Sequence, residues 1–190
     1  MMTVSLVQLA TVIGDLGANL VAAERGIREA AAEEPDIVVL PEAWNLGFLP
    51  DDLSDAETAG AGPAHDLLGC LAAELGVHIV GGSIFCRDRG DVRNRCFVFD
   101  RRGERVATCD KQHPFAPMGE DQHVRAGEGA GPFELDGVPC GVLICYDLRF
   151  PEVARRLAFG GAKVLFVPAQ WPEARLAAWR TLLRARAIEN

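Results

Sequence analysis

The stretch that decides the fold is Val138-Pro139-Cys140-Gly141-Val142-Leu143-Ile144-Cys145-Tyr146-Asp147. It begins as an apolar run typical of a buried strand and ends on a thiol followed by polar residues. Pro151, a residue type favoured in the first turn of a helix, follows closely. This pattern predicts a sharp strand-to-helix turn that lifts Cys145 out of a sheet. The N–H of Tyr146 would then be free to hold an oxyanion, and the helix dipole would favour a thiolate. Cys145 is therefore a candidate nucleophile for acyl transfer.

Short apolar runs alternate with helical stretches on both sides of this turn. Strands are predicted at 4–8, 37–40, 78–83 and 163–167, and helices at about 18–33, 63–75, 151–159 and 173–188. Turns at 101–104 and 136–137 predict two hairpins, one pairing 96–100 with 105–109 and one joining Phe133 to the Cys145 strand. The irregular segment 112–131 is of the length at which loops tend to carry function. The predicted fold is α/β, with a mixed sheet and helices covering sheet faces.

Composition limits the function classes. The chain has 190 residues, is 49% hydrophobic and fits one globular domain over residues 1–190. Its net charge is -8, and its arginines are scattered among acidic residues, which argues against nucleic acid and against an anionic membrane as partners. The N-terminus lacks a basic leader and no window approaches the ~18 apolar residues of a spanning helix, so a cytoplasmic location is predicted.

The cysteines, histidines and C-terminal arginines have plain structural interpretations. The six cysteines are expected to be free thiols, five of them structural, because they lie in or beside core-forming elements. The four histidines are dispersed and no C-x-x-C or H-E-x-x-H spacing occurs, so neither a metal nor another cofactor is predicted. The arginines of the last predicted helix are expected on its solvated side: Arg175, Arg180, Arg184 and Arg186.

Two charged residues complement the thiol. A thiol nucleophile needs a proton acceptor, and its tetrahedral intermediate needs positive charge or hydrogen-bond donors. Glu42 follows the apolar run 37–40 and Pro41, and Lys111 follows the run that ends at Cys109. Ligand sites of α/β sheets lie at the carboxyl ends of strands. We therefore expect Glu42, Lys111 and Cys145 to converge at one edge of the sheet.

These positions also carry a resemblance to a known family. Leu40-Pro41-Glu42, Asp110-Lys111-Gln112-His113 and Ile144-Cys145-Tyr146-Asp147-Leu148-Arg149-Phe150-Pro151-Glu152 resemble, in this order, the three motifs of the nitrilase superfamily of carbon-nitrogen hydrolases. Further similarity lies in Gly81-Gly82-Ser83, Asn94, Met118-Gly119-Glu120 and the run 184–190. The resemblance therefore covers essentially the whole chain.

The resemblance implies an αββα sandwich and a Glu-Lys-Cys triad that works without a cofactor. Cys145 would attack the substrate carbon, Glu42 would move the proton, and Lys111 with the N–H of Tyr146 would hold the oxyanion. Glu120 matches a second glutamate that helps to orient the substrate near the lysine; a plain loop glutamate is the alternative. The Cys-Tyr-Asp-Leu-Arg-Phe-Pro and Gln-Trp-Pro runs look most like bacterial ω-amidase-type members, which implies hydrolysis of a small linear carboxamide by water.

Several alternatives stay open. A nitrilase or an N-carbamoyl amide hydrolase would use the same triad. Family members continue past the position of Asn190, so the chain is expected to lack their C-terminal part, and a non-catalytic interaction fragment is a rival interpretation. The same resemblance predicts a homodimer or a higher homo-oligomer. Trp171 is predicted either to line the substrate pocket or to pack on a sheet edge, and Trp44 carries the same two interpretations.

Overall fold

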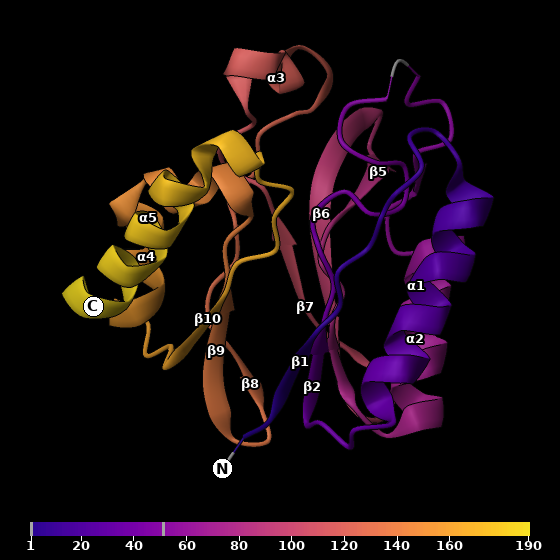
Figure 1. The fold of residues 1–190 in the computed structure, drawn as a ribbon, viewed down its shortest axis with the longest axis horizontal. Coiled ribbons are helices and arrows are strands. Elements are labelled where there is room, and N and C mark those ends of the chain that lie inside the picture. Colours follow the sequence, from indigo (N-terminus) through magenta and orange to yellow (C-terminus); the bar gives the residue numbers. More distant parts are fainter. Residues whose placement is uncertain (1, 51) are drawn as a thin grey trace.

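A computed structural model describes residues 2–50 and 52–190 as two facing sheets with helices on both outer sides. The larger sheet contains β1 (Val4–Leu6), β2 (Ile37–Val39), β3 (Glu57–Thr58), β4 (His78–Val80), β5 (Ile84–Asp88), β6 (Asp91–Phe99) and β7 (Arg105–Asp110). The smaller contains β8 (Phe133–Leu135), β9 (Val138–Val142) and β10 (Val164–Phe166). The α/β sandwich with mixed sheets is confirmed (Figure 1).

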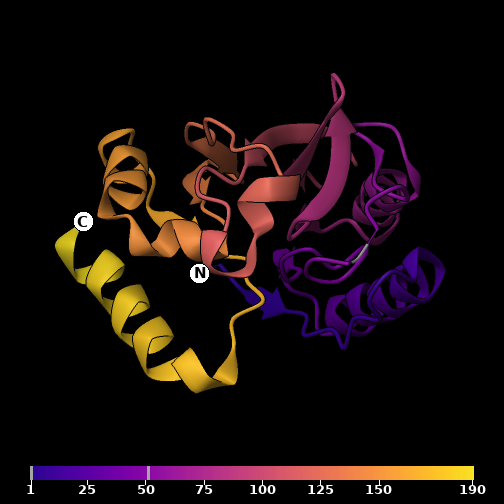
Figure 2. The ribbon, with the colours of Figure 1, turned by 90° about the horizontal axis from the view of Figure 1, so that it is seen from above.

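The helices cover the outer faces. The α-helices are α1 (Leu16–Ala31), α2 (Pro63–Leu75), α3 (Glu120–His123), α4 (Pro151–Phe159) and α5 (Leu176–Glu189). Three 3-10 turns accompany them: η1 (Ala116–Met118), η2 (Cys145–Arg149) and η3 (Glu173–Arg175). Figure 2 shows that α4 and α5 lie on the side of the molecule opposite α1 and α2. None of the described helices is long and apolar enough to cross a membrane.

Strand β2 lies in the interior of the larger sheet, as expected for a strand that is apolar on both faces. In the larger sheet the order is β1-β2-β4-β6-β5-β3, and β7 pairs with β6 as well. All three residues of β2 are buried, because this strand lies between two parallel neighbours and between two layers of side chains. Ile37 and Val39 contribute to the core between the sheets, whereas Val38 packs under the helices. This alternation fixes the strand register.

Local sequence signals set the helix ends. Asp15 caps α1, its side chain accepting a hydrogen bond from the N–H of Ala18 at 2.9 Å. Helix α2 begins with Pro63 and ends before Gly76, which has the left-handed conformation that favours glycine. Both α2 and α4 have the bounds that their sequence patterns predict.

Four details differ from the sequence-based expectation. The strand predicted at 78–83 ends at Val80, because Gly82 turns the chain at a φ of +65° into the unpredicted β5. Strand β6 begins at Asp91 instead of residue 96, since it pairs along its first half with β5. The two-residue β3 carried no apolar run that could reveal it. The segment 112–131 contains η1 and α3 and is not wholly irregular.

Candidate active site

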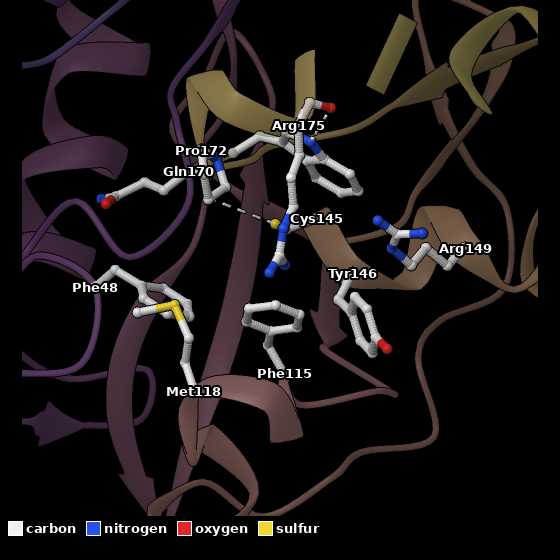
Figure 3. Close-up of a pocket in the computed structure, with 10 residues that line it drawn as sticks. Phe48, Phe115, Met118, Cys145, Tyr146, Arg149, Gln170, Pro172 and Arg175 are labelled. Atoms are coloured by element: carbon white, nitrogen blue, oxygen red, sulfur yellow. Dashed lines mark hydrogen bonds between the residues drawn. The ribbon is translucent and has the colours of Figure 1, made fainter. Parts of the chain in front are cut away.

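Cys145 lies at the turn that the sequence predicts. It follows β9 and begins η2 with a φ of +46°, a conformation that is strained for a residue with a side chain. Its N–H donates to the carbonyl of Pro168, after β10, at 2.9 Å. The expected sharp turn is confirmed, but it enters a 3-10 turn six residues before α4. The side chain is nearly buried and its sulfur borders a cavity (Figure 3).

Lys111, Glu42 and Glu120 form a buried ionic cluster. The Lys111 Nζ lies 2.7 Å from Glu42 Oε1 and 2.6 Å from Glu120 Oε2, and all three side chains are fully buried. Burial by itself lowers the pKa of Lys111, but the charges of Glu42 and Glu120 outweigh burial, so the pKa lies above its ordinary value. The lysine is therefore a fixed cation. Of the three residues expected to converge, Glu42 and Lys111 are in direct contact, and their charges also act on the Cys145 thiol.

Two side chains that sequence reasoning did not assign to the site hold the glutamates in place. The Asn94 amide of β6 donates to Glu42 Oε1 at 3.1 Å and to Glu120 Oε1 at 2.9 Å. The Gln170 main-chain N–H donates to Glu42 Oε2 at 3.0 Å, and its side-chain amide donates to the Glu42 carbonyl at 2.8 Å. A buried polar residue within a strand is the signal that marks Asn94, and a polar residue just past a strand end is the signal that marks Gln170.

The thiol is held in its protonated form. Burial raises the pKa of Cys145 well above its ordinary value, and the negative charge of Glu42 raises it further, against an opposing effect of Lys111. This differs from the expected thiolate. The reason is that η2 spans only five residues, so its dipole is small, while desolvation acts in full. A group that removes the proton during attack is consequently needed.

A cavity of about 330 Å³ opens beside the thiol. Aromatic and other apolar side chains make up most of its wall, and the lining residues are Phe48, Phe115, Met118, Cys145, Tyr146, Arg149, Gln170, Trp171, Pro172 and Arg175 (Figure 3). Trp171 thus lines the cavity, as one of its two interpretations predicts. Trp44 instead lies in the core, where its indole donates to the Gly81 carbonyl at 2.8 Å. The cavity size suits a small molecule.

Two guanidinium groups border this cavity. Arg149 Cζ lies 5.3 Å from the ring centroid of Trp171, and Arg175 Cζ lies 5.4 Å from that of Phe115. Among the described residues neither arginine pairs with a carboxylate. The expectation of a solvated helix side is wrong for Arg186, whereas Arg175 is exposed but lies just before α5. Arg175 belongs to η3 at the cavity, and Arg186 is buried, donating to the Leu148 carbonyl at 3.0 Å.

One main-chain hydrogen-bond donor lies next to the nucleophile in the sequence. The N–H of Tyr146 follows the nucleophile in the first turn of η2, where main-chain N–H groups lack partners within the turn. In the described part of the chain no acceptor is assigned to it. Among the described residues, no group of three or more His, Cys, Asp or Glu side chains is placed to hold a metal ion. All six cysteines are free thiols.

Comparison with known proteins identifies the class. A sequence model of carbon-nitrogen hydrolases matches residues 3–190, and the chain belongs to this family. It is 40% identical to the 2-oxoglutaramate amidase of Bacillus subtilis (strain 168) over 188 residues, which cover 99% of this chain and 72% of that protein. It is 32% identical to the omega-amidase NIT2 of Danio rerio, covering 90% of this chain and 65% of that one.

The fold comparison agrees. The structure of a CN-hydrolase superfamily protein from Xanthomonas campestris matches with a TM-score of 0.90 and 33% sequence identity, and the match covers 100% of this chain and 72% of that one. That protein carries an arsenic adduct in its active site. The chain described here is accordingly a carbon-nitrogen hydrolase.

Proposed function

We propose that the protein hydrolyses small linear carboxamides that carry a carboxylate at the far end, releasing ammonia through a thioester on Cys145. One observation carries this proposal: the thiol borders the same small apolar cavity as two guanidinium groups that pair with no carboxylate in the described part of the chain. The apolar wall suits a short carbon chain, and a guanidinium group suits a carboxylate. The two ends of such a substrate would thus meet complementary chemistry.

Acylation uses the buried cluster. Glu42 accepts the thiol proton while Cys145 Sγ forms a bond to the amide carbon, which turns the carbonyl oxygen into an oxyanion. Lys111 and the N–H of Tyr146 hold that charge. The intermediate collapses, the carbon-nitrogen bond breaks, and Glu42 gives its proton to the leaving ammonia. The raised pKa of the thiol supports this assignment, because the proton has to leave during attack.

Deacylation reverses the roles with water. Glu42 takes a proton from a water molecule, whose oxygen attacks the thioester carbon, and the second oxyanion is held as the first one was. When the carbon-sulfur bond breaks, the thiol regains the proton from Glu42 and the carboxylic acid leaves. Glu120 does not exchange protons in this scheme. With Asn94 it keeps Lys111 charged and in position.

The names of two relatives point the same way. The Bacillus subtilis protein is a 2-oxoglutaramate amidase and the Danio rerio protein an omega-amidase. A substrate of this kind has an amide at one end and a carboxylate at the other. The arginines give a physical reason to extend the substrate class to this chain.

The test is ammonia release from matched compounds. Succinamate and butyramide have chains of similar length and differ in the terminal carboxylate, and a nitrile and an N-carbamoyl compound complete the panel. We expect succinamate to be the best substrate, with no release by the Cys145→Ala variant. Arg149→Gln and Arg175→Gln should each lower kcat/KM for succinamate about tenfold, as expected for one charge-assisted hydrogen bond. Arg180→Gln, on the exposed side of α5, is the control.

The outcomes separate the alternatives. Equal rates on succinamate and butyramide would overturn the carboxylate requirement, and preference for the nitrile or the carbamoyl compound would replace the amide reaction with that of the alternative subclass. The predicted homodimer or higher homo-oligomer rests on the family resemblance, and light scattering after size exclusion tests it. A cytoplasmic location also remains a prediction.

A further inference from the structure

Asp147 joins the two strand ends that carry the nucleophile and the lysine. Its side chain is fully buried in the 3-10 turn η2, which begins at Cys145. Its Oδ2 accepts from the Ile144 N–H at 3.1 Å, and its Oδ1 accepts from the N–H groups of His113 at 2.9 Å and Gln112 at 3.2 Å. One carboxylate thus binds main-chain groups from two distant parts of the chain.

The N–H groups that donate to Asp147 come from both sheets. Ile144 directly precedes Cys145 at the end of β9, in the smaller sheet, and Gln112 directly follows Lys111 at the end of β7, in the larger sheet. Between the sheets lies an apolar core, and apolar contacts are non-directional. Hydrogen bonds are directional, so the Asp147 carboxylate, together with the Gln170–Glu42 hydrogen bonds, restricts how one sheet shifts on the other near the site.

His113 strengthens this link. Its Nδ1 lies 2.8 Å from Asp147 Oδ1, and its ring stacks on Phe150 at a centroid distance of 3.6 Å and an interplanar angle of 7°. Phe150 directly follows η2, so the histidine holds the far end of the turn that starts at Cys145. A carboxylate offers about four acceptor positions. The donors described here use that capacity, which explains how a charge can be buried at this place.

We propose that Asp147 is a positioning residue that sets the separation between the Cys145 thiol and the Lys111 ammonium across the sheet interface. It does not line the cavity, so it acts through main chain and not on the substrate. The oxyanion is attached to the carbon atom that is bonded to Cys145, but Lys111 stabilises its charge. Cys145 follows a strand of the smaller sheet, and Lys111 follows a strand of the larger sheet. The inference rests on the proposed function of these two residues.

The test compares Asp147→Asn with wild type on succinamate. The amide is nearly isosteric but replaces one acceptor oxygen with a donor, so at least one main-chain N–H loses its partner. We expect kcat to fall about 30-fold or more, in the range that loss of one oxyanion contact gives, while KM changes less than threefold. Alkylation of Cys145 by iodoacetamide, which forms no oxyanion, should keep its rate.

Succinic semialdehyde supplies a readout that a merely structural role would not move. Cys145 Sγ adds to its aldehyde carbon, and the aldehyde oxygen then occupies the position of the oxyanion. In Asp147→Asn its inhibition constant should therefore rise by the same factor by which kcat/KM falls. His113→Gln, which removes one donor and keeps the main chain, should show the same pattern at about three- to tenfold and carries the test if Asp147→Asn does not fold. Asp136→Asn is the control, because Asp136 bridges Arg101 and His78 at the other end of β9.

The outcomes are distinct. Lowered kcat with a parallel rise of the inhibition constant supports positioning. If the Asp147 and His113 variants lose thermal stability but keep kcat within twofold, or if kcat falls while the inhibition constant stays fixed, the positioning role is overturned. A wild-type protein that turns over no compound of the panel would instead refute the proposed function, and the two failures are therefore distinguishable.

Discussion

The Lys111→Met variant removes a buried cation and replaces it with an unbranched apolar side chain that is one atom shorter. In the protein the ammonium lies within 2.7 Å of carboxylate oxygens of Glu42 and of Glu120, and none of these side chains is exposed. Breaking a buried ion pair by removing one partner costs about 3–5 kcal/mol. Because a domain is typically stable by about 5–15 kcal/mol, the variant should still fold with a small margin.

The pH dependence of this variant has a definite sign. Without Lys111, two buried carboxylates that share the Asn94 amide would face each other without a cation, and their repulsion favours a proton on one of them in the folded state. The native state then binds more protons than the unfolded chain, and the free energy of unfolding rises as the pH falls. The slope approaches about 1.4 kcal/mol per pH unit for one proton. In wild type the raised pKa of Lys111 keeps this cation between the two carboxylates.

Urea unfolding followed by tryptophan fluorescence at pH 8 and pH 6 checks both effects. Lys163→Met is the matched control, since Lys163 is the second lysine of the chain and is exposed. The double variant Lys111→Met with Glu120→Gln removes one of the uncompensated charges and should recover part of the lost stability. Amide turnover should fall at least about 100-fold in both Lys111 variants. A Lys111→Met protein that unfolds at the wild-type urea concentration at both pH values would refute the reasoning.

Three further predictions test other parts of the structure. Gly82→Ala should cost about 3 kcal/mol or more in urea unfolding, because its Cβ would clash with the Pro41 carbonyl next to Glu42. Gly90→Ala, with no atom within 4 Å, should cost only about 1–2 kcal/mol of φ strain, and equal losses would contradict the packing. Burial raises the pKa of Cys86 to about 12, so stability from this thiol is full below pH 9 and is lost toward pH 12; the melting temperature should fall between pH 9 and 12, and less steeply in Cys86→Ala. Cys145→Ser should retain the melting temperature and lose turnover, and an active Cys145→Ser would remove the thioester from the mechanism.

The order of the helices and strands could be predicted from the sequence because it depends on local patterns. Helices α2 and α4 were placed to the residue by a proline at one end and an apolar period between. Strands β3 and β5 were not predicted. Strand β3 has only two residues, too few to show alternating hydrophobicity, and the glycine turn before β5 lies within a continuous apolar run. Their pairing partners, not their own residues, make them strands.

The sequence by itself determined the chemical type of the site. Glu42, Lys111 and Cys145 each follow a buried strand, and strand ends of α/β sheets gather at one edge, so their convergence could be predicted although Glu42 and Lys111 lie 69 residues apart. Only the tertiary structure decided what surrounds them. The protonated thiol, the Asn94 bridge, the two cavity arginines and the Asp147 link all depend on burial and on contacts between distant segments, which local periodicity does not encode.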